Sequence, residues 1–243
     1  MLGTVITEYL NSRQGGPWGS AQVSNLNESM VVVMRFRIGG HLCFLSHAET
    51  LKVFERALVR AGIRLRYSEG YNPRPRLSLP LPRSVGVEAD DDLLCFAVEG
   101  SEAVEQEDFK GRLCPKLPAG FELRSVEVRR GRAPFQPAEA TYVLELRREF
   151  LTDELKAGAE RLPHQQCLYV QRPIKGGPHT RTVDVAPFLE SVEISGNHLL
   201  VRCRITDRGS IRIGEVLELL GLDASHLASP IRRTAVQWQE KYG

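Results

Sequence analysis

Residues 64–83 gather side chains that are suited to binding an anion. This stretch holds five arginines and one acid, Glu69, and tyrosines lie between them. A guanidinium group offers forked donors that match a phosphate, and a tyrosine ring can stack on a base. Pro73 and Pro75 restrict the backbone on either side of one arginine, so we expect a stiff loop. The predicted anion-binding residues are Arg64, Arg66, Tyr67, Tyr71, Asn72, Arg74, Arg76 and Arg83.

A structural interpretation of the same residues is also open. Arginines along an exposed strand edge discourage unwanted pairing with other strands, and Asn72 can close a turn instead of contacting a base. The rigid prolines favour the anion-binding interpretation, because they would hold the arginines in place before a ligand arrives.

His47 is the candidate catalytic residue. It follows Ser46, which together with Glu49 has the spacing of a capping box at the start of a helix. Free backbone amides and the helix dipole favour an anion there, and a neutral imidazole could bind phosphate or act as a general base. The alternative is a histidine that only packs beside the helix cap, because no second histidine or carboxylate stands near it at ligand spacing.

A secondary candidate site comprises Lys175, Arg181 and Asp184. Two glycines follow Lys175, but the phosphate-loop spacing G-x-x-x-x-G-K is absent, so a mobile hairpin tip is the competing interpretation. Asp184 interrupts an apolar strand pattern, and we expect it to pair with Arg181 or with a partner.

Several classes of function are disfavoured by what the sequence lacks. Its five cysteines are widely spaced without a C-x-x-C pair, which argues against a disulfide framework, a zinc ribbon and an iron–sulfur cluster. The motifs G-x-S-x-G, H-E-x-x-H and G-x-G-x-x-G are absent. We therefore expect no metal and no cofactor, and a binding protein is favoured over an enzyme. No apolar run approaches the roughly 18 residues of a membrane span, and no signal-peptide pattern is present, so a cytoplasmic location without membrane contact is predicted.

The spacing of apolar residues predicts an α+β protein with two ferredoxin-like (βαββαβ) units in tandem. We assign the first unit to residues 30–130 and the second to residues 139–240, with a linker over residues 131–138. Residues 1–29 are polar and rich in glycine and serine, which predicts a disordered tail. The true start of translation is Met1, Met30 or Met34.

Residues 41–86 resemble the radical-SAM-linked family, a domain of uncharacterised function found alone or attached to cobalamin-binding radical S-adenosylmethionine proteins. Weaker similarity extends over most of Val31–Gln239. The resemblance implies a radical SAM enzyme or an RNA-processing machine as a partner, because free-standing members tend to be encoded near ribonuclease E/G and ribosomal-protein genes. The motifs that carry it are Phe44–His47, Phe54–Leu58 with Ala61-Gly62, Tyr67–Pro75, Leu77-Ser78 before Pro80–Pro82, Arg181–Val185 with Pro187-Phe188, and Ile231–Thr234.

Two departures from the family pattern limit what the resemblance implies. The family usually shows Leu-Asp after the histidine, where this chain has Ala48-Glu49. It often has a histidine between the two loop prolines, where this chain has Arg74, so only a charge-binding role carries over to that position. The chain also lacks cluster-binding cysteines, and the radical enzyme would therefore be a partner.

Three functions follow from these observations. The first is a non-catalytic accessory protein that binds RNA or presents a substrate to a radical SAM enzyme or to RNA-processing machinery; no DNA partner is expected. The second is a metal-independent enzyme acting on RNA, with His47 as base and Arg74 or Arg76 stabilising an oxyanion. The third is a protein-interaction scaffold for an acidic partner, which would use the same arginines. The sequence does not indicate the oligomeric state.

Overall fold

The computed structural model of the chain describes residues 30–99, 106–131, 135–174, 176–177 and 179–240. The tail predicted to be disordered, residues 1–29, lies outside the described residues, and so does Lys175. Among the described residues, no helix is long and apolar enough to cross a membrane.

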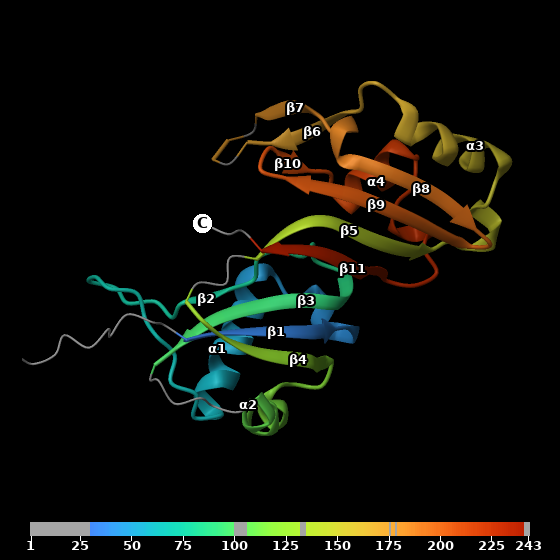
Figure 1. The fold of residues 1–243 in the computed structure, drawn as a ribbon. Coiled ribbons are helices and arrows are strands. Elements are labelled where there is room, and N and C mark those ends of the chain that lie inside the picture. Colours follow the sequence, from blue (N-terminus) through green and yellow to red (C-terminus); the bar gives the residue numbers. More distant parts are fainter. Residues whose placement is uncertain (1–29, 100–105, 132–134, 175, 178, 241–243) are drawn as a thin grey trace, which may run out of the picture.

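The first unit alternates strands and helices in the predicted order. Its strand β1 lies between β3 and β4, and β2 pairs with the outer edge of β3, in each case antiparallel. This pairing gives the sheet order β2–β3–β1–β4 (Figure 1). The elements are β1 (Met30–Ile38), α1 (His47–Arg60), β2 (Leu77–Ser78), β3 (Val87–Val98), α2 (Gln106–Leu113) and β4 (Phe121–Arg130).

The second unit repeats this order with one insertion. Its strands are arranged β8–β9–β5–β11, again with antiparallel neighbours. A separate two-stranded hairpin, β6 (Tyr169–Pro173) with β7 (Thr180–Asp184), is inserted between α3 and β8. The remaining elements are β5 (Phe135–Glu145), α3 (Asp153–Arg161), β8 (Leu189–Ser195), β9 (His198–Thr206), β10 (Gly209–Ser210), α4 (Ile213–Leu219) and β11 (Ile231–Glu240).

The two units share one sheet. Residues 231–233 of β11 run parallel to residues 87–89 of β3, and this contact joins the two sets of strands into a nine-stranded sheet within the described part of the chain. The α+β class is confirmed. The predicted linker is too long, because β5 already begins at Phe135, where its pairing with the end of β11 extends the strand beyond what the local sequence indicates.

Each unit has its own hydrophobic core between sheet and helices. In the first unit, Phe36 of β1 packs edge-on against Phe54 of α1, with 4.7 Å between ring centroids. In the second, residues of β5 and β9 such as Leu144 and Val201 are fully buried with α3 and α4. A smaller cluster on the first unit, centred on Cys95, is covered by Trp238 from β11 and by Phe135 from β5.

Helix α1 follows its sequence signals closely. The Glu49 amide donates to the Ser46 hydroxyl at 3.3 Å, and the Ser46 amide donates to the Glu49 carboxylate at 2.9 Å, so the predicted capping box is present. The helix buries Phe54 and Leu58, and it ends just before Gly62, whose φ of 67° is the left-handed conformation that favours glycine.

The segment between α1 and β3 contains little regular structure. Leu77–Ser78 forms a strand, and two isolated bridges hold the rest. Prolines explain this, because Pro73, Pro75 and Pro80 have no amide hydrogen to donate to a neighbouring strand.

Candidate functional site

Residues 64–76 form a narrow hairpin that projects from the first unit beside β2 (Figure 1). We call it the arginine hairpin. An antiparallel bridge joins Tyr67 and Pro75. On either side of this bridge, the Ser68 amide donates to the Arg74 carbonyl and the Arg76 amide donates to the Arg66 carbonyl, both at 2.8 Å. The two arms of the hairpin are therefore held in register.

The turn of the hairpin is stiffened by a side chain. The Arg74 amide donates to the Ser68 hydroxyl at 3.0 Å, which satisfies a donor between the two prolines. Gly70 adopts a φ of 125°, a conformation that other residues avoid. This local closure supports the predicted stiffness of the loop.

The base of the hairpin is attached to the end of β3. The Arg66 amide donates to the Ala97 carbonyl at 2.8 Å, and the Ala97 amide donates to the Arg76 carbonyl at 2.9 Å. Leu65 also bridges Val98, and both side chains are buried in the core of the first unit. The arginine backbones are thus fixed to a rigid strand, while their side chains are left exposed or half-buried.

The register of the hairpin places its arginines on one face. Residues opposite each other in an antiparallel pair point to the same side, so Arg66 lies beside Arg76, and Arg74 lies beside Ser68. Arg64, two residues before Arg66, is on the same side by the alternation of an extended chain. Within the described part of the chain, the side chains of Arg64, Arg66, Arg74 and Arg76 form no ion pair or hydrogen bond.

This arrangement is unfavourable for the protein alone. Like charges that face each other across a strand pair destabilise it, and Arg66 and Arg76 face each other without a carboxylate between them. The one acid of the hairpin, Glu69, lies at the turn and has no ion-pair partner among the described residues. An anion bound along this face would relieve the repulsion.

The aromatic candidates lie on the same hairpin and are open to solvent. Tyr71 at the turn is fully exposed, and Tyr67 is 42% exposed. Asn72 beside Tyr71 is also exposed. These side chains are accessible to a ligand that spans the tip of the hairpin.

Arg83 does not belong to this surface. Its guanidinium donates to the backbone carbonyls of Cys43 at 2.6 Å, of Leu45 at 3.2 Å and of Val87, and it thereby ties the start of α1 to the start of β3. Burial lowers the pKa of this guanidinium below its usual range. Because its donors are already used by the protein, we remove Arg83 from the predicted anion-binding set.

A buried ion pair beside Arg83 fastens the two units together, and the sequence analysis did not identify it. The Arg233 guanidinium of β11 donates to the Asp92 carboxylate of β3 at 2.6 Å, and both residues are almost completely buried. Burial raises the pKa of the Asp92 carboxyl group, and the charge of Arg233 opposes that rise. No local signal marks the pair, since its members are far apart in the sequence.

His47 occupies the first position of α1, as predicted, but its surroundings do not favour catalysis. Its Nδ1 atom is buried and has no hydrogen-bond partner among the described residues. The carboxylate nearest in the sequence, Glu49, is used by the capping box. No hydrogen bond or ion pair joins its side chain to the arginine hairpin within the described part of the chain, and its catalytic role stays a prediction.

The secondary candidate site does not assemble. The Asp184 carboxylate accepts hydrogen bonds from the amides of Leu168 at 2.9 Å and Ala186 at 3.1 Å, and these bonds lower its pKa. Asp184 therefore holds the base of the β6–β7 hairpin and does not pair with Arg181, which is exposed on β7. Lys175 is outside the described residues.

A groove of about 760 Å³ lies at the junction of the two units, next to the arginine hairpin. Its walls are the proline-rich segment that includes Pro80 and Pro82, the start of β5, and the turn between β9 and β10. Gln136 and Gln239 stand directly opposite each other on β5 and β11 at this groove. The sequence analysis missed these residues because they meet only through pairing between distant strands.

Comparisons with known protein families and proteins show what this chain is similar to. A model of an uncharacterised protein family conserved in bacteria, DUF2344, matches residues 32–213. The chain belongs to this family. The matched range of DUF2344 includes α1, the arginine hairpin and the proline-rich wall of the groove. No curated protein matches the chain.

One solved structure that matches this chain is a chain in the crystal structure of a Cbf5–Nop10–Gar1 complex, with 14% sequence identity and a TM-score of 0.42. The match covers 84% of this chain and 48% of the other, so this chain spans about half the length of that relative. A likeness at this level carries no argument about function.

Other kinds of site were also sought. Among the described residues, no group of three histidine, cysteine or acidic side chains lies close enough to hold a metal ion. Cys43, Cys95 and Cys203 are buried, and burial raises the pKa of the Cys95 thiol to about 11 and that of Cys203 to about 12. Such thiols are poor nucleophiles at neutral pH. Cys114 and Cys167 are exposed.

Proposed function

We propose that this DUF2344 protein is a non-catalytic accessory that binds RNA through its arginine hairpin. The observation that carries the proposal is the pair Arg66 and Arg76, which face each other without a carboxylate partner in the described structure. A polyanion lying along this face would neutralise both side chains at once, together with Arg64 and Arg74.

The tyrosines favour RNA over other anions. A small phosphate or an acidic peptide would use the arginines but would gain little from a fully exposed ring such as Tyr71. An unpaired base can stack on that ring, and base–aromatic stacking contributes about 1–3 kcal/mol per base. Cationic side chains beside exposed rings on a rigid hairpin therefore suit a single-stranded or looped RNA.

The same geometry supports binding and not turnover. General acid–base chemistry needs a proton-transferring group within hydrogen-bond reach of the reacting atom. His47 is the sequence candidate, but no hydrogen bond or ion pair joins its side chain to the arginine hairpin among the described residues. We therefore propose that a partner carries out any chemistry on the bound RNA, and the resemblance to the radical-SAM-linked family suggests a radical SAM enzyme or an RNA-processing machine for this role.

The test is a binding titration of the purified protein with a fluorescent RNA at low salt. Replacing Arg74 and Arg76 with alanine should weaken binding at least tenfold, because each charge-assisted contact is worth roughly 1.5–3 kcal/mol. Arg202→Ala is the matched control: this arginine of β9 is similarly exposed, but it is paired with Glu193 at 3.5 Å. It should leave affinity within about twofold.

Two results would overturn the proposal. One is an absence of RNA binding at low salt, and the other is an equal loss of affinity in the double variant and in the Arg202 control. A pulldown from cell lysate with and without nuclease distinguishes RNA binding from the alternative, a scaffold for an acidic protein. Partners that are retained by the arginine hairpin after complete digestion of RNA would favour an acidic protein over RNA.

A further inference from the structure

The groove at the junction of the two units begins where the arginine hairpin ends. Ser78 lines the groove, and it follows Arg76 by two residues in the same extended segment. Extended chain rises about 3.3 Å per residue, so the backbones of these two residues are about 7 Å apart. A ligand whose phosphates lie on the hairpin therefore reaches the mouth of the groove within one nucleotide.

The chemistry of the groove differs from that of the hairpin. Among the described residues, no lysine or arginine lines it, and the one charged residue that does is the acid Asp207. It is therefore unsuited to a phosphate. Its polar side chains are amides and hydroxyls, which both donate and accept hydrogen bonds. They are Ser78, Gln136, Thr206, Ser210 and Gln239.

Two of these side chains are available for a ligand. Gln136 and Gln239 are exposed, stand opposite each other across β5 and β11, and have no side-chain hydrogen bond among the described residues. The neighbouring walls include the apolar and rigid prolines Pro80 and Pro82. Flat apolar walls with a few donors and acceptors at the edge match an unstacked nucleobase.

We propose that the groove holds a base of single-stranded RNA whose phosphates lie on the arginine hairpin. This inference rests on the proposed function and adds to it a substrate class, an RNA with at least one unpaired base. The hairpin supplies affinity through phosphate contacts, which carry no sequence information, and the groove supplies discrimination through contacts to the base edge.

The experiment compares two fluorescent oligonucleotides of equal length and charge, a single-stranded RNA and the same backbone without bases in its central part. The parent protein should bind the RNA about tenfold more tightly than the abasic strand. In the double variant Gln136→Ala, Gln239→Ala, this preference should fall severalfold, with the part due to stacking on Tyr71 retained, and the salt dependence should stay that of the parent. Gln237→Ala, an exposed glutamine of β11 outside the groove, is the control and should keep the preference.

The outcomes separate this inference from the proposed function. If the parent binds both strands equally, and binding weakens with salt, the hairpin binds RNA but the groove takes no base. If the double variant keeps the parent's preference, the base contacts lie elsewhere and the inference is wrong. If neither strand binds at low salt, the proposed function and this inference fall together. Thermal melts of both variants check that the fold is retained.

Discussion

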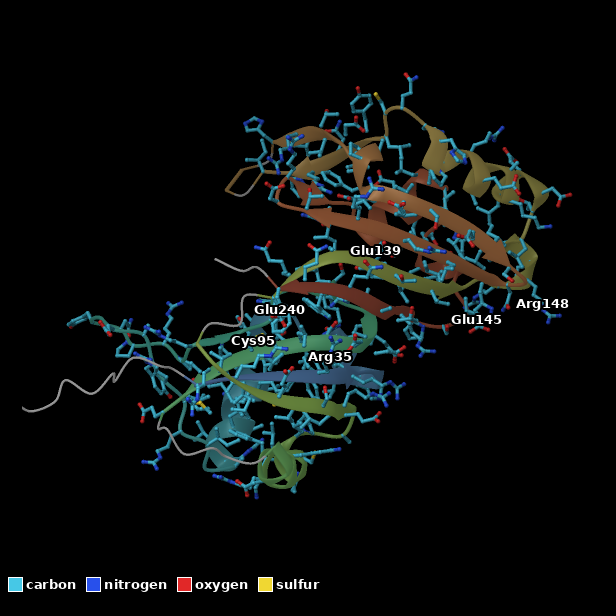
Figure 2. All side chains as sticks on the ribbon, viewed as in Figure 1. Arg35, Cys95, Glu139, Glu145, Arg148 and Glu240 are labelled. Carbon is cyan, nitrogen blue, oxygen red and sulfur yellow. The ribbon has the colours of Figure 1, made fainter. Side chains whose placement is uncertain are left out.

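The arginines of the hairpin and the arginines of the second unit differ in what lies beside them. On β9, Arg202 is paired with Glu193 and Arg204 with Glu190, both from the neighbouring strand β8. Figure 2 labels Glu139 on β5, the residue that stands opposite Arg204 on the other side of β9. On the hairpin, Arg66 stands beside Arg76.

We propose that pairing, and not the number of arginines, distinguishes a binding surface from a structural one. Cross-strand pairs of opposite charge stabilise a sheet, and this use of arginine needs no ligand. Arg35 follows the same rule, because it lies on β1 and is paired with Asp91 of β3 at 2.6 Å (Figure 2). The hairpin is the region where four neighbouring arginines lack such partners in the described structure.

The largest expected effect comes from breaking the buried pair. Arg233→Ala would leave the Asp92 carboxylate buried without its partner and should lower the free energy of unfolding by about 3–5 kcal/mol. Urea denaturation followed by circular dichroism measures this loss. The double variant Arg233→Met, Asp92→Leu is the control and should recover most of the stability, because no unpaired charge remains. A loss below about 1 kcal/mol for Arg233→Ala would show that the pair is not a structural fastening.

A smaller loss of stability should follow from Arg83→Met. This change removes the guanidinium donor to the carbonyls of Cys43, Leu45 and Val87 while keeping much of the side-chain volume; the Cys43 carbonyl keeps the Gly86 amide at 2.9 Å. We expect about 2 kcal/mol of destabilisation and unchanged affinity for RNA, since a buried acceptor without a partner costs about 1–3 kcal/mol. Denaturation of this variant measures its stability, and a titration with RNA measures its affinity. Normal stability with weakened binding would return Arg83 to the anion-binding set.

The capping box offers a test of intermediate size. Ser46→Ala removes the hydroxyl that accepts from the Glu49 amide, and the loss of a helix cap typically costs about 1 kcal/mol. RNA affinity should stay within about twofold of the parent, because the cap is not part of the arginine hairpin. If binding fell while the melting temperature held, the start of α1 and His47 would belong to the binding site after all.

The smallest expected change in stability is informative because it is an increase. Arg66→Thr removes one of two like charges that face each other, and it should raise the free energy of unfolding by about 0.2–1 kcal/mol. The same change should weaken RNA binding. Arg35→Thr, which breaks a cross-strand ion pair, is the matched control and should not raise stability. A clear loss of stability in Arg66→Thr would mean that Arg66 has a structural partner.

Much of the start of α1 and of the arginine hairpin could be predicted from the sequence, because the signals for both are local. The capping box depends on Ser46 and Glu49, three residues apart, and both bonds form as expected. The two prolines and the alternation of arginines between residues 64 and 76 are likewise read directly from neighbouring positions. Where the deciding contacts are close in the sequence, the residue types were a sufficient guide.

The errors arise where the deciding contact is distant. Arg83 looks like its neighbours in composition, but its acceptors include backbone carbonyls about 40 residues away, which no pattern of side chains indicates. Asp184 is predicted to pair with Arg181 or with a partner, yet it accepts from two backbone amides. The groove depends on the pairing of β5 with β11 and on the parallel contact of β11 with β3, and both are properties of the folded sheet.

We propose that the unpaired arginines of the hairpin bind RNA phosphates. The salt dependence of RNA affinity is the measurement that bears on this proposal at its source. For single strands, the logarithm of the binding constant falls against the logarithm of salt concentration by about 0.7 per neutralised phosphate. Four hairpin arginines predict a slope of about −2.8 for the parent and about −1.4 for the double variant Arg66→Ala, Arg76→Ala, with the parent slope kept in Arg202→Ala. A slope that is flat in the parent, or equal in the parent and the double variant, would contradict the claim.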